Sequence, residues 1–355
     1  MKRKFWIVIT LMLCLLLAGC DLWMDGEYHS VTPHRLENAA KEDAPALCRS
    51  YTEVRNALVD MVETGTTKGV IYVDGMTKEE LDGFMGDAIS FATRNHAIGA
   101  YAVDQISYEI GTNAATPAVA VDISYAHSRT EILRIKRTTT MDEAIKVITT
   151  ALDNCNADVV LYVSQYTTTD ITQLVEDYVD ANPDSCMETP QVTVLTYPER
   201  GIERVIEISF TYQTSRETLR SMQETVSPVF TSAELYVRGD AEAWEKYSQL
   251  YSFLMERYDY TIETSITPAY SLLRHGVGDS KAFALVYAKM CQRAGLDCQV
   301  IPGTKSGEAW YWNAIQVDDV YYHIDLLACN QEGFFQAKTE EGMSGYVWDY
   351  SAFVS

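Results

Sequence analysis

The stretch that decides the fold runs from Gly276 to Asp325 and opens with Gly276-Val277-Gly278-Asp279-Ser280. The two glycines favour a turn, and the last two residues are types that begin helices by accepting hydrogen bonds from free backbone N–H groups. We predict a helix over Lys281–Arg293, because Ala294-Gly295 is a typical C-terminal signal. The remaining residues up to Asp325 are predicted to form strands.

A β-hairpin is predicted where Val317 and Val320 flank a two-residue turn. In this register Trp312 lies opposite Asp325, and alternate side chains point to opposite faces. Trp310 then lies diagonal to Asp325, within reach of its side chain. The more apolar face should be buried, and it holds Tyr311, Asn313, Ile315, Val317, Val320, Tyr322 and Ile324. The other face should line a cleft, and it holds Trp310, Trp312, Ala314, Gln316, Tyr321, His323 and Asp325. A register slip of one residue would exchange the two faces.

The last third of the chain resembles the transglutaminase-like, papain-type domains. The resemblance rests on the order and spacing of short motifs: Tyr247-Ser248-Gln249-Leu250-Tyr251, Tyr258-Asp259-Tyr260, Tyr270-Ser271-Leu272-Leu273, His275 to Ser280, Val300-Ile301-Pro302-Gly303, Trp312-Asn313, Tyr321 to Asp325, and Gly345-Tyr346-Val347-Trp348-Asp349. In that family a Cys begins the central helix, a His follows on one strand and an Asp on the next.

At these three positions the chain has Ser280, Trp310 and Asp325. A serine nucleophile needs a general base, and the indole nitrogen of tryptophan is a donor only. The resemblance therefore implies a papain-like transglutaminase core without a catalytic triad, and we predict that this domain is inactive. The alternative is a serine-dependent peptidase or acyltransferase that uses Ser280, with His323 or His275 as its base.

A binding role is the leading interpretation. Aromatic side chains with a few polar groups suit peptide or glycan ligands, and we expect a groove lined by Trp310, Trp312, Tyr321 and His323. The partner would be a peptide, a protein or a glycan of the cell envelope. Two alternatives stay open: Trp310 fills the former site as core, or the whole chain is architectural.

The N-terminus predicts export and a lipid anchor. Three basic residues precede the apolar run Phe5–Leu17, which ends in Leu17-Ala18-Gly19-Cys20 and resembles a bacterial lipobox. We expect residues 1–19 to be a signal peptide, Cys20 to be lipidated, and residues 20–48 to be a tether. The protein would then be extracytoplasmic, anchored to the cell membrane as a lipoprotein. An ordinary secretory signal or an uncleaved anchor is the alternative.

The composition excludes several classes of partner. The formal net charge of −22 argues against nucleic acid. Neither a CxxC pair nor a His-Cys cluster has metal-ligand spacing, so we predict no metal and no cofactor. Cys155 and Cys186 should follow two successive helices at one edge of their unit. An exported chain permits a disulfide between them, and two buried free thiols are the equal alternative.

Residues 49–137 and 138–230 are predicted to be two copies of one α+β unit, followed by the transglutaminase-like domain at 231–355. Val70-Ile71-Tyr72-Val73 matches Val160-Leu161-Tyr162-Val163, and Ser128-Arg129 matches Ser215-Arg216. Each copy should read helix, strand, helix, strand, strand. The predicted helices are 52–63, 78–94, 142–153 and 170–180, and the predicted strands are 69–74, 100–110, 118–125, 158–164, 191–197 and 204–212. Leu235-Tyr236-Val237, between helices predicted at 216–226 and 243–257, suggests a partial third copy.

Overall fold

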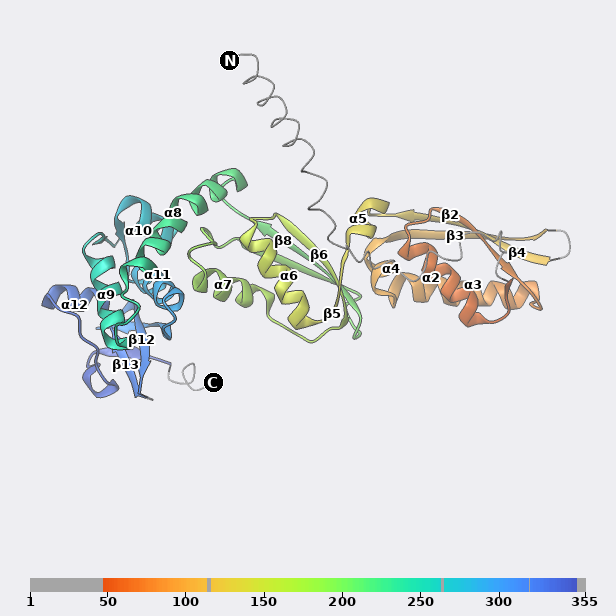
Figure 1. Ribbon diagram of the computed structural model, residues 1–355. Coiled ribbons are helices and arrows are strands. Elements are labelled where there is room, and N and C mark those ends of the chain that lie inside the picture. The colour runs from red at the N-terminus through yellow and green to blue at the C-terminus, as the bar shows by residue number, and fades with distance from the viewer. Residues whose placement is uncertain (1–46, 114–115, 263–264, 319, 350–355) are drawn as a thin grey trace, which may run out of the picture. The chain divides into compact units, whose positions relative to one another are not determined.

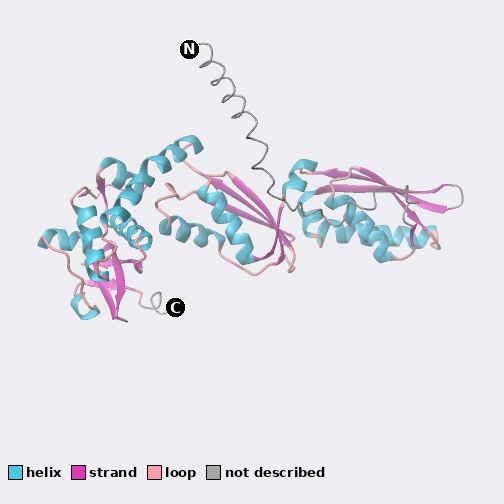
Figure 2. Cartoon of the chain, viewed as in Figure 1, coloured by secondary structure: helices cyan, strands magenta, loops and turns pink. Residues whose placement is uncertain are grey.

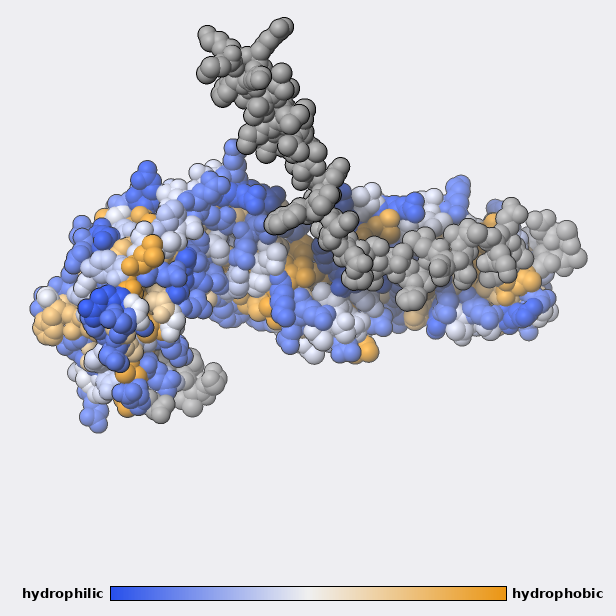
Figure 3. Space-filling view, viewed as in Figure 1, coloured by the Kyte–Doolittle hydropathy of each residue, from blue (hydrophilic) through white to orange (hydrophobic). Residues whose placement is uncertain are grey.

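The computed structural model describes residues 47–113, 116–262, 265–318 and 320–349 (Figure 1). The predicted signal peptide, Cys20 and nearly all of the predicted tether lie outside these residues. No helix of the described part is long and apolar enough to cross a membrane. The face shown in Figure 3 is mostly hydrophilic with scattered apolar residues, in keeping with the large acidic excess of the sequence.

The first α+β unit is a four-stranded sheet whose helices lie on one face (Figures 1 and 2). Its strands are ordered β1-β2-β4-β3, and β4 is antiparallel to both of its neighbours β2 and β3. The elements are β1 (Leu47–Cys48), α2 (Tyr51–Glu63), β2 (Lys68–Val73), α3 (Lys78–Arg94), α4 (Ala97–Ala102), β3 (Val103–Asn113) and β4 (Thr116–Tyr125).

The second unit has the same strand order, β5-β6-β8-β7, with β8 antiparallel to β6 and β7. Helix α5 (Arg129–Arg134) closes the first unit, since Ile132 belongs to the core of that unit. The elements of the second unit are β5 (Lys136–Thr140), α6 (Met141–Asp153), β6 (Asp158–Gln165), α7 (Ile171–Ala181), β7 (Gln191–Tyr197) and β8 (Arg204–Thr211). This shared order is the topology expected of a duplicated unit. The helices and strands predicted for both copies are present, with their ends shifted by no more than a few residues.

The Ser-Arg pairs that marked the repeat have the same structural role in both copies. Ser128-Arg129 and Ser215-Arg216 each begin a helix, with the serine side chain accepting a hydrogen bond from the backbone. Each arginine Nε then donates to the last carbonyl at the end of an earlier helix, Thr64 O at 3.0 Å and Asn154 O at 3.1 Å. The arginines thereby satisfy carbonyl groups that the ends of α2 and α6 leave free.

Cys155 is a buried free thiol, as is Cys186. Of the two alternatives, the structure has two buried free thiols and no disulfide between these residues. Cys155 adopts a left-handed φ of 48°, at the place where the first copy has Gly65 with φ 62°. A non-glycine residue is strained in this conformation. Cys155 is therefore both buried and held in an unfavourable backbone conformation.

The predicted third copy is wrong, because α8 (Arg216–Tyr236) is one continuous helix and contains Leu235 and Tyr236. Pro228 lies inside this helix, where proline costs about 3 kcal/mol. The helix continues because a single buried stripe runs along it, made of Leu219, Val226, Phe230 and Ala233.

The C-terminal domain packs helices against one face of a four-stranded sheet of order β13-β12-β11-β14. With the two preceding sheets, it makes the fold α+β, as predicted. Its elements are α9 (Ala243–Met255), β9 (Asp259–Tyr260), α10 (Pro268–His275), β10 (Val277–Gly278), α11 (Ser280–Arg293), β11 (Cys298–Lys305), β12 (Glu308–Val317), β13 (Val320–Ile324), α12 (Leu326–Glu332), the 3₁₀ turn η1 (Glu340–Gly342) and β14 (Tyr346–Trp348).

The predicted hairpin register is confirmed, since Val317 pairs with Val320 and Ala314 with His323. The face with Trp310, Trp312 and His323 was predicted to line an open cleft, and this prediction is wrong. The exposed fractions of Trp312 and His323 are only 1% and 6%. A second small core covers this face, and it contains Ile301, Trp312, Ala314 and Met343 with Trp310, Tyr346 and Trp348 packed against them. Trp312 and His323 on this face are buried because the C-terminal tail folds back over this part of the sheet.

Candidate functional site

Ser280 is the first residue of α11, and Asp279 precedes it as the N-cap. The Asp279 carboxylate accepts a 2.8 Å hydrogen bond from the backbone N–H of Ala282, which is why the helix starts here. Ser280 is 7% exposed, and its Oγ accepts a 3.3 Å hydrogen bond from the backbone N–H of Tyr311. The hydroxyl is therefore buried against β12 at the positive end of a helix.

Trp310 and Asp325 are brought together as the sequence predicted. The indole Nε1 of Trp310 donates a 3.0 Å hydrogen bond to Oδ2 of Asp325. Ser280 lies next to this pair, because its Oγ is bonded to Tyr311, the residue after Trp310. The three positions that the resemblance gives to a triad thus form one cluster at the junction of α11, β12 and the end of β13.

Asp325 is a buried carboxylate whose two oxygens are both engaged. Oδ2 also accepts from Lys305 Nζ at 2.8 Å and from the Tyr346 hydroxyl at 2.6 Å. Oδ1 accepts from the backbone N–H groups of Leu327 and Ala328 and so caps α12. A carboxylate that is 7% exposed needs such partners, since an unpaired buried charge is costly.

Sequence reasoning missed the roles of Lys305 and Tyr346. The lysine ends β11 and the tyrosine begins β14, so neither is near Asp325 in the sequence. Tyr346 belongs to a tail motif of the family resemblance, but that motif did not indicate a partner. Burial, and secondly its hydrogen bond to Asp325, raise the pKa of the Tyr346 hydroxyl, which keeps it a neutral donor.

The Trp310 ring is held between neighbours. Lys305 Nζ lies 4.9 Å from the centre of the ring, a cation–π contact, and the Tyr260 ring lies 5.8 Å away on a tilted plane. Trp310 is half-buried, and it packs against both the main core and the small core of the domain. It therefore fills the position that the family resemblance gives to a histidine. Tyr321, by contrast, is 44% exposed.

Neither His323 nor His275, the two alternative bases, forms a hydrogen bond with Ser280. His323 Nδ1 accepts a 3.1 Å hydrogen bond from the Trp312 indole, and burial lowers the pKa of this imidazole. His275 ends α10 and contacts the Tyr270 ring edge-on. Within the part of the chain that the structure describes, no imidazole is hydrogen-bonded to Ser280 Oγ. The same part contains no group of three or more His, Cys, Asp or Glu side chains that could hold a metal ion.

Comparison with protein families matches residues 231–338 to the Transglutaminase-like superfamily. This segment is therefore a transglutaminase-like domain. Among solved structures, LapG of Legionella pneumophila in an EGTA-treated form is similar at 11% identity, with 38% of this chain and 72% of that chain covered and a TM-score of 0.26. A structure described as a TGase is similar at 10% identity, with 76% and 74% covered and a TM-score of 0.27. Comparison with curated proteins finds no match.

Proposed function

We propose that the transglutaminase-like domain is catalytically inert and serves as a binding or scaffold module at the cell envelope. The observation that carries this proposal is the hydrogen bond from Trp310 Nε1 to Asp325 Oδ2. The acid that would orient a catalytic imidazole is bonded to an indole instead.

Acyl transfer needs a general base, an activated nucleophile and an acid that orients the base, and Trp310, Ser280 and Asp325 do not supply them. Indole nitrogen cannot accept a proton, so Trp310 cannot act as a general base. A serine hydroxyl stays protonated near neutral pH and becomes a useful nucleophile only beside a base. Asp325 is occupied by Trp310, Lys305 and Tyr346, and its other oxygen caps a helix. The helix N-terminus at Ser280 remains, but its electrostatic help does not remove a proton.

The proposed location follows from the N-terminal sequence. The basic residues, the apolar run Phe5–Leu17 and the small residues before Cys20 occur in the order of a lipoprotein signal. A lipid on Cys20 would hold the chain at the membrane on its extracytoplasmic side. There the partner would be a peptide, a protein or a glycan of the envelope, and no nucleic acid.

A fluorophosphonate probe tests the inert site on the full-length protein in detergent. The probe forms a covalent bond only with an activated serine, and we expect no labelling of the wild type above the level of Ser280→Ala. A generic serine hydrolase in the same tube shows that the probe is active. Stoichiometric labelling that disappears in Ser280→Ala would instead establish the serine-dependent enzyme.

Mass spectrometry of the mature N-terminus tests the anchor. We expect a chain that begins at Cys20 with an added diacylglycerol and that sediments with membranes. An unmodified Cys20, or a chain that retains Met1, would remove the proposed location without affecting the argument about Ser280.

A further inference from the structure

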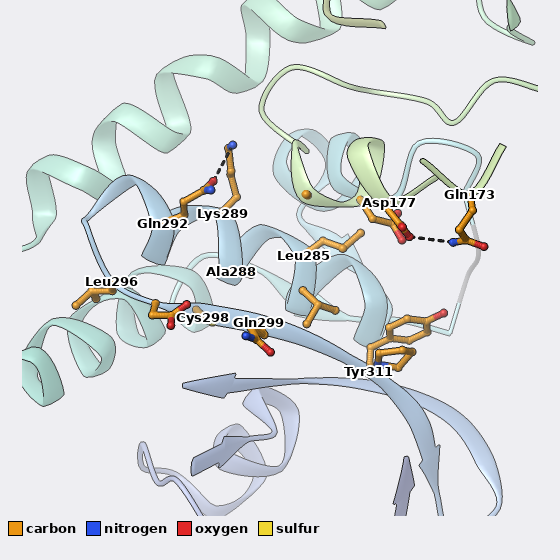
Figure 4. Close-up of a pocket in the computed structure, with 15 residues that line it drawn as sticks. Gln173, Asp177, Leu285, Ala288, Lys289, Gln292, Leu296, Cys298, Gln299 and Tyr311 are labelled. Carbon is orange, nitrogen blue, oxygen red and sulfur yellow. Dashed lines mark hydrogen bonds between the residues drawn. The ribbon is translucent and has the colours of Figure 1, made fainter. Parts of the chain in front are cut away.

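A groove of about 550 Å³ lies between α7 of the second α+β unit and the elements α11 and β11 of the transglutaminase-like domain (Figure 4). In Figure 4, Gln173 and Asp177 lie at the same end as Tyr311, and Gln292, Leu296 and Cys298 lie at the other. The Ser280 hydroxyl is not part of its lining.

The two sides of the groove are held together by ion pairs and by a shared core. Lys281 Nζ lies 2.8 Å from Asp180, and Lys289 Nζ lies 3.4 Å from Asp184. Met187 of the second unit belongs to the same apolar cluster as α11. These contacts fix the position of α7 relative to α11, and side chains of both helices line the groove.

The other wall is an open strand edge. β11 pairs with β12 along its whole length, but β14 pairs only with Gly303–Lys305 of β11. Over Cys298–Pro302, the edge opposite β12 has no strand partner among the described residues. An unpaired edge presents backbone N–H and C=O groups that can bind another extended chain.

The register shows which groups are available on this edge. Lys305 and Glu308 flank a two-residue turn, and the flanking pair of such a hairpin exchanges hydrogen bonds. Peptide groups alternate along a strand, so those of Cys298 and Val300 point away from β12, towards the open edge. Pro302 offers a carbonyl and no N–H.

The charge of the lining favours a cationic ligand. The lining includes the carboxylates of Asp177, Asp180 and Asp297 and the single ammonium of Lys289. Asp180 is paired with Lys281, and Lys289 is paired with Asp184. Asp177 and Asp297 form no ion pair with any other residue that the structure describes, so two negative charges remain for a partner.

We propose that this groove binds an extended peptide rich in lysine or arginine, which adds as a strand to the open edge of β11. Backbone hydrogen bonds with Cys298 and Val300 would provide affinity, and alternate side chains would reach Asp177 and Asp297. Leu285 and Tyr311 offer apolar contact to the side chains between them. The inference rests on the proposed binding function and gives that function a place separate from Ser280.

The test is fluorescence anisotropy of the full-length protein in detergent with a labelled heptapeptide of alternating lysine and valine. We expect saturable binding, which Asp177→Lys weakens by about tenfold, since one exposed attraction of modest strength is lost and a repulsion of similar size replaces it. The matched control is Glu176→Lys on the same helix, exposed and outside the groove, which should change the affinity by less than about threefold. On binding, the Val300 amide should exchange its hydrogen more slowly.

Two further peptides and one sugar separate the outcomes. A glutamate–valine peptide should not bind, and a backbone N-methylated lysine–valine peptide should lose binding because it has no donors for the edge. Equal binding of the N-methylated peptide would overturn strand addition. Binding of a tetrasaccharide of N-acetylglucosamine in place of the peptide would overturn the ligand class. Failure of every peptide, with Ser280 still unreactive to fluorophosphonate, would remove the groove proposal and leave the inert domain standing.

Discussion

Trp310 donates its indole N–H to the carboxylate of Asp325 across 3.0 Å. The resemblance seen in the sequence gives a histidine and an aspartate to these two positions, which lie within the matched residues 231–338. The indole of Trp310 donates to this carboxylate as an imidazole would, but an indole nitrogen cannot accept a proton. The network around Asp325, with Lys305 and Tyr346, is a structural arrangement that ties β11, β12 and β14 to the start of α12.

Removing the indole donor should destabilise the domain measurably. Trp310→Phe keeps most of the ring contacts and deletes one hydrogen bond to a buried carboxylate, so we expect a loss of about 1–2 kcal/mol in the free energy of unfolding. Urea unfolding followed by circular dichroism measures it. Trp244→Phe is the matched control, because Trp244 is partly exposed and should cost much less. Equal losses would mean that the Trp310 hydrogen bond has no special weight.

Asp325 should matter more than Trp310, because it neutralises Lys305 and caps α12. Asp325→Ala leaves the Lys305 ammonium and several donors without their acceptor, and we expect a loss of about 3–5 kcal/mol. Asp325→Asn can still cap the helix and should lose less. Thermal unfolding of the two variants side by side gives the order, and an alanine variant as stable as the wild type would contradict the network described here.

Introducing a cysteine at position 280 together with a histidine at position 310 should create a reactive thiol. Ser280→Cys alone should stay unreactive near neutral pH, because a thiol without an imidazolium is mostly protonated. Ser280→Cys with Trp310→His places an imidazole between the thiol and Asp325 and should lower the thiol pKa. The rate of alkylation by iodoacetamide between pH 5 and 8 reports the thiolate. Ser280→Cys with Trp310→Phe is the control that opens similar space without a base, and an equal rate in both double variants would refute the assignment of position 310.

Stability should fall with acidity in part through His323. Burial lowers the pKa of this imidazole in the folded state below its ordinary value of about 6.5. The unfolded chain therefore takes up a proton first as the pH falls, so the contribution of neutral His323 is complete above about pH 6.5 and is lost below it. His96 is buried too, and burial lowers its pKa despite the opposing effect of Glu63.

The pH effect is measured by melting temperature from pH 8 to pH 5. Each histidine can contribute a slope of up to about 1.4 kcal/mol per pH unit. His323→Gln should flatten the acid side of the curve, whereas the same change at His127, for which the ring stacks on Tyr101, serves as a comparison. A curve unchanged by His323→Gln would show that other groups control the acid sensitivity.

Local signals in the sequence determined most of the elements. The helix start at Asp279-Ser280, the end of α11 at Ala294-Gly295 and the hairpin pair Val317–Val320 depend on backbone hydrogen bonds between residues close in the chain, and all three are present. The Ser-Arg pairs predicted the repeat because each is a helix cap with a fixed partner in its own unit. The spacing from Trp310 to Asp325 placed these two side chains on adjacent strands in contact range, as the family resemblance implied.

Only the tertiary structure decided what covers each face. Alternation along β12 and β13 defines two faces, but burial of Trp312 and His323 depends on Met343 and Trp348, which reach them through the fold of the tail. Likewise Lys305 meets Asp325 because β11 and β12 pair, and α8 continues through Pro228 because its apolar stripe is buried. Short-range hydrogen bonds depend on residues that are neighbours in the sequence, so local patterns predict them. Burial depends on contacts with residues far along the chain, so no local pattern predicts it.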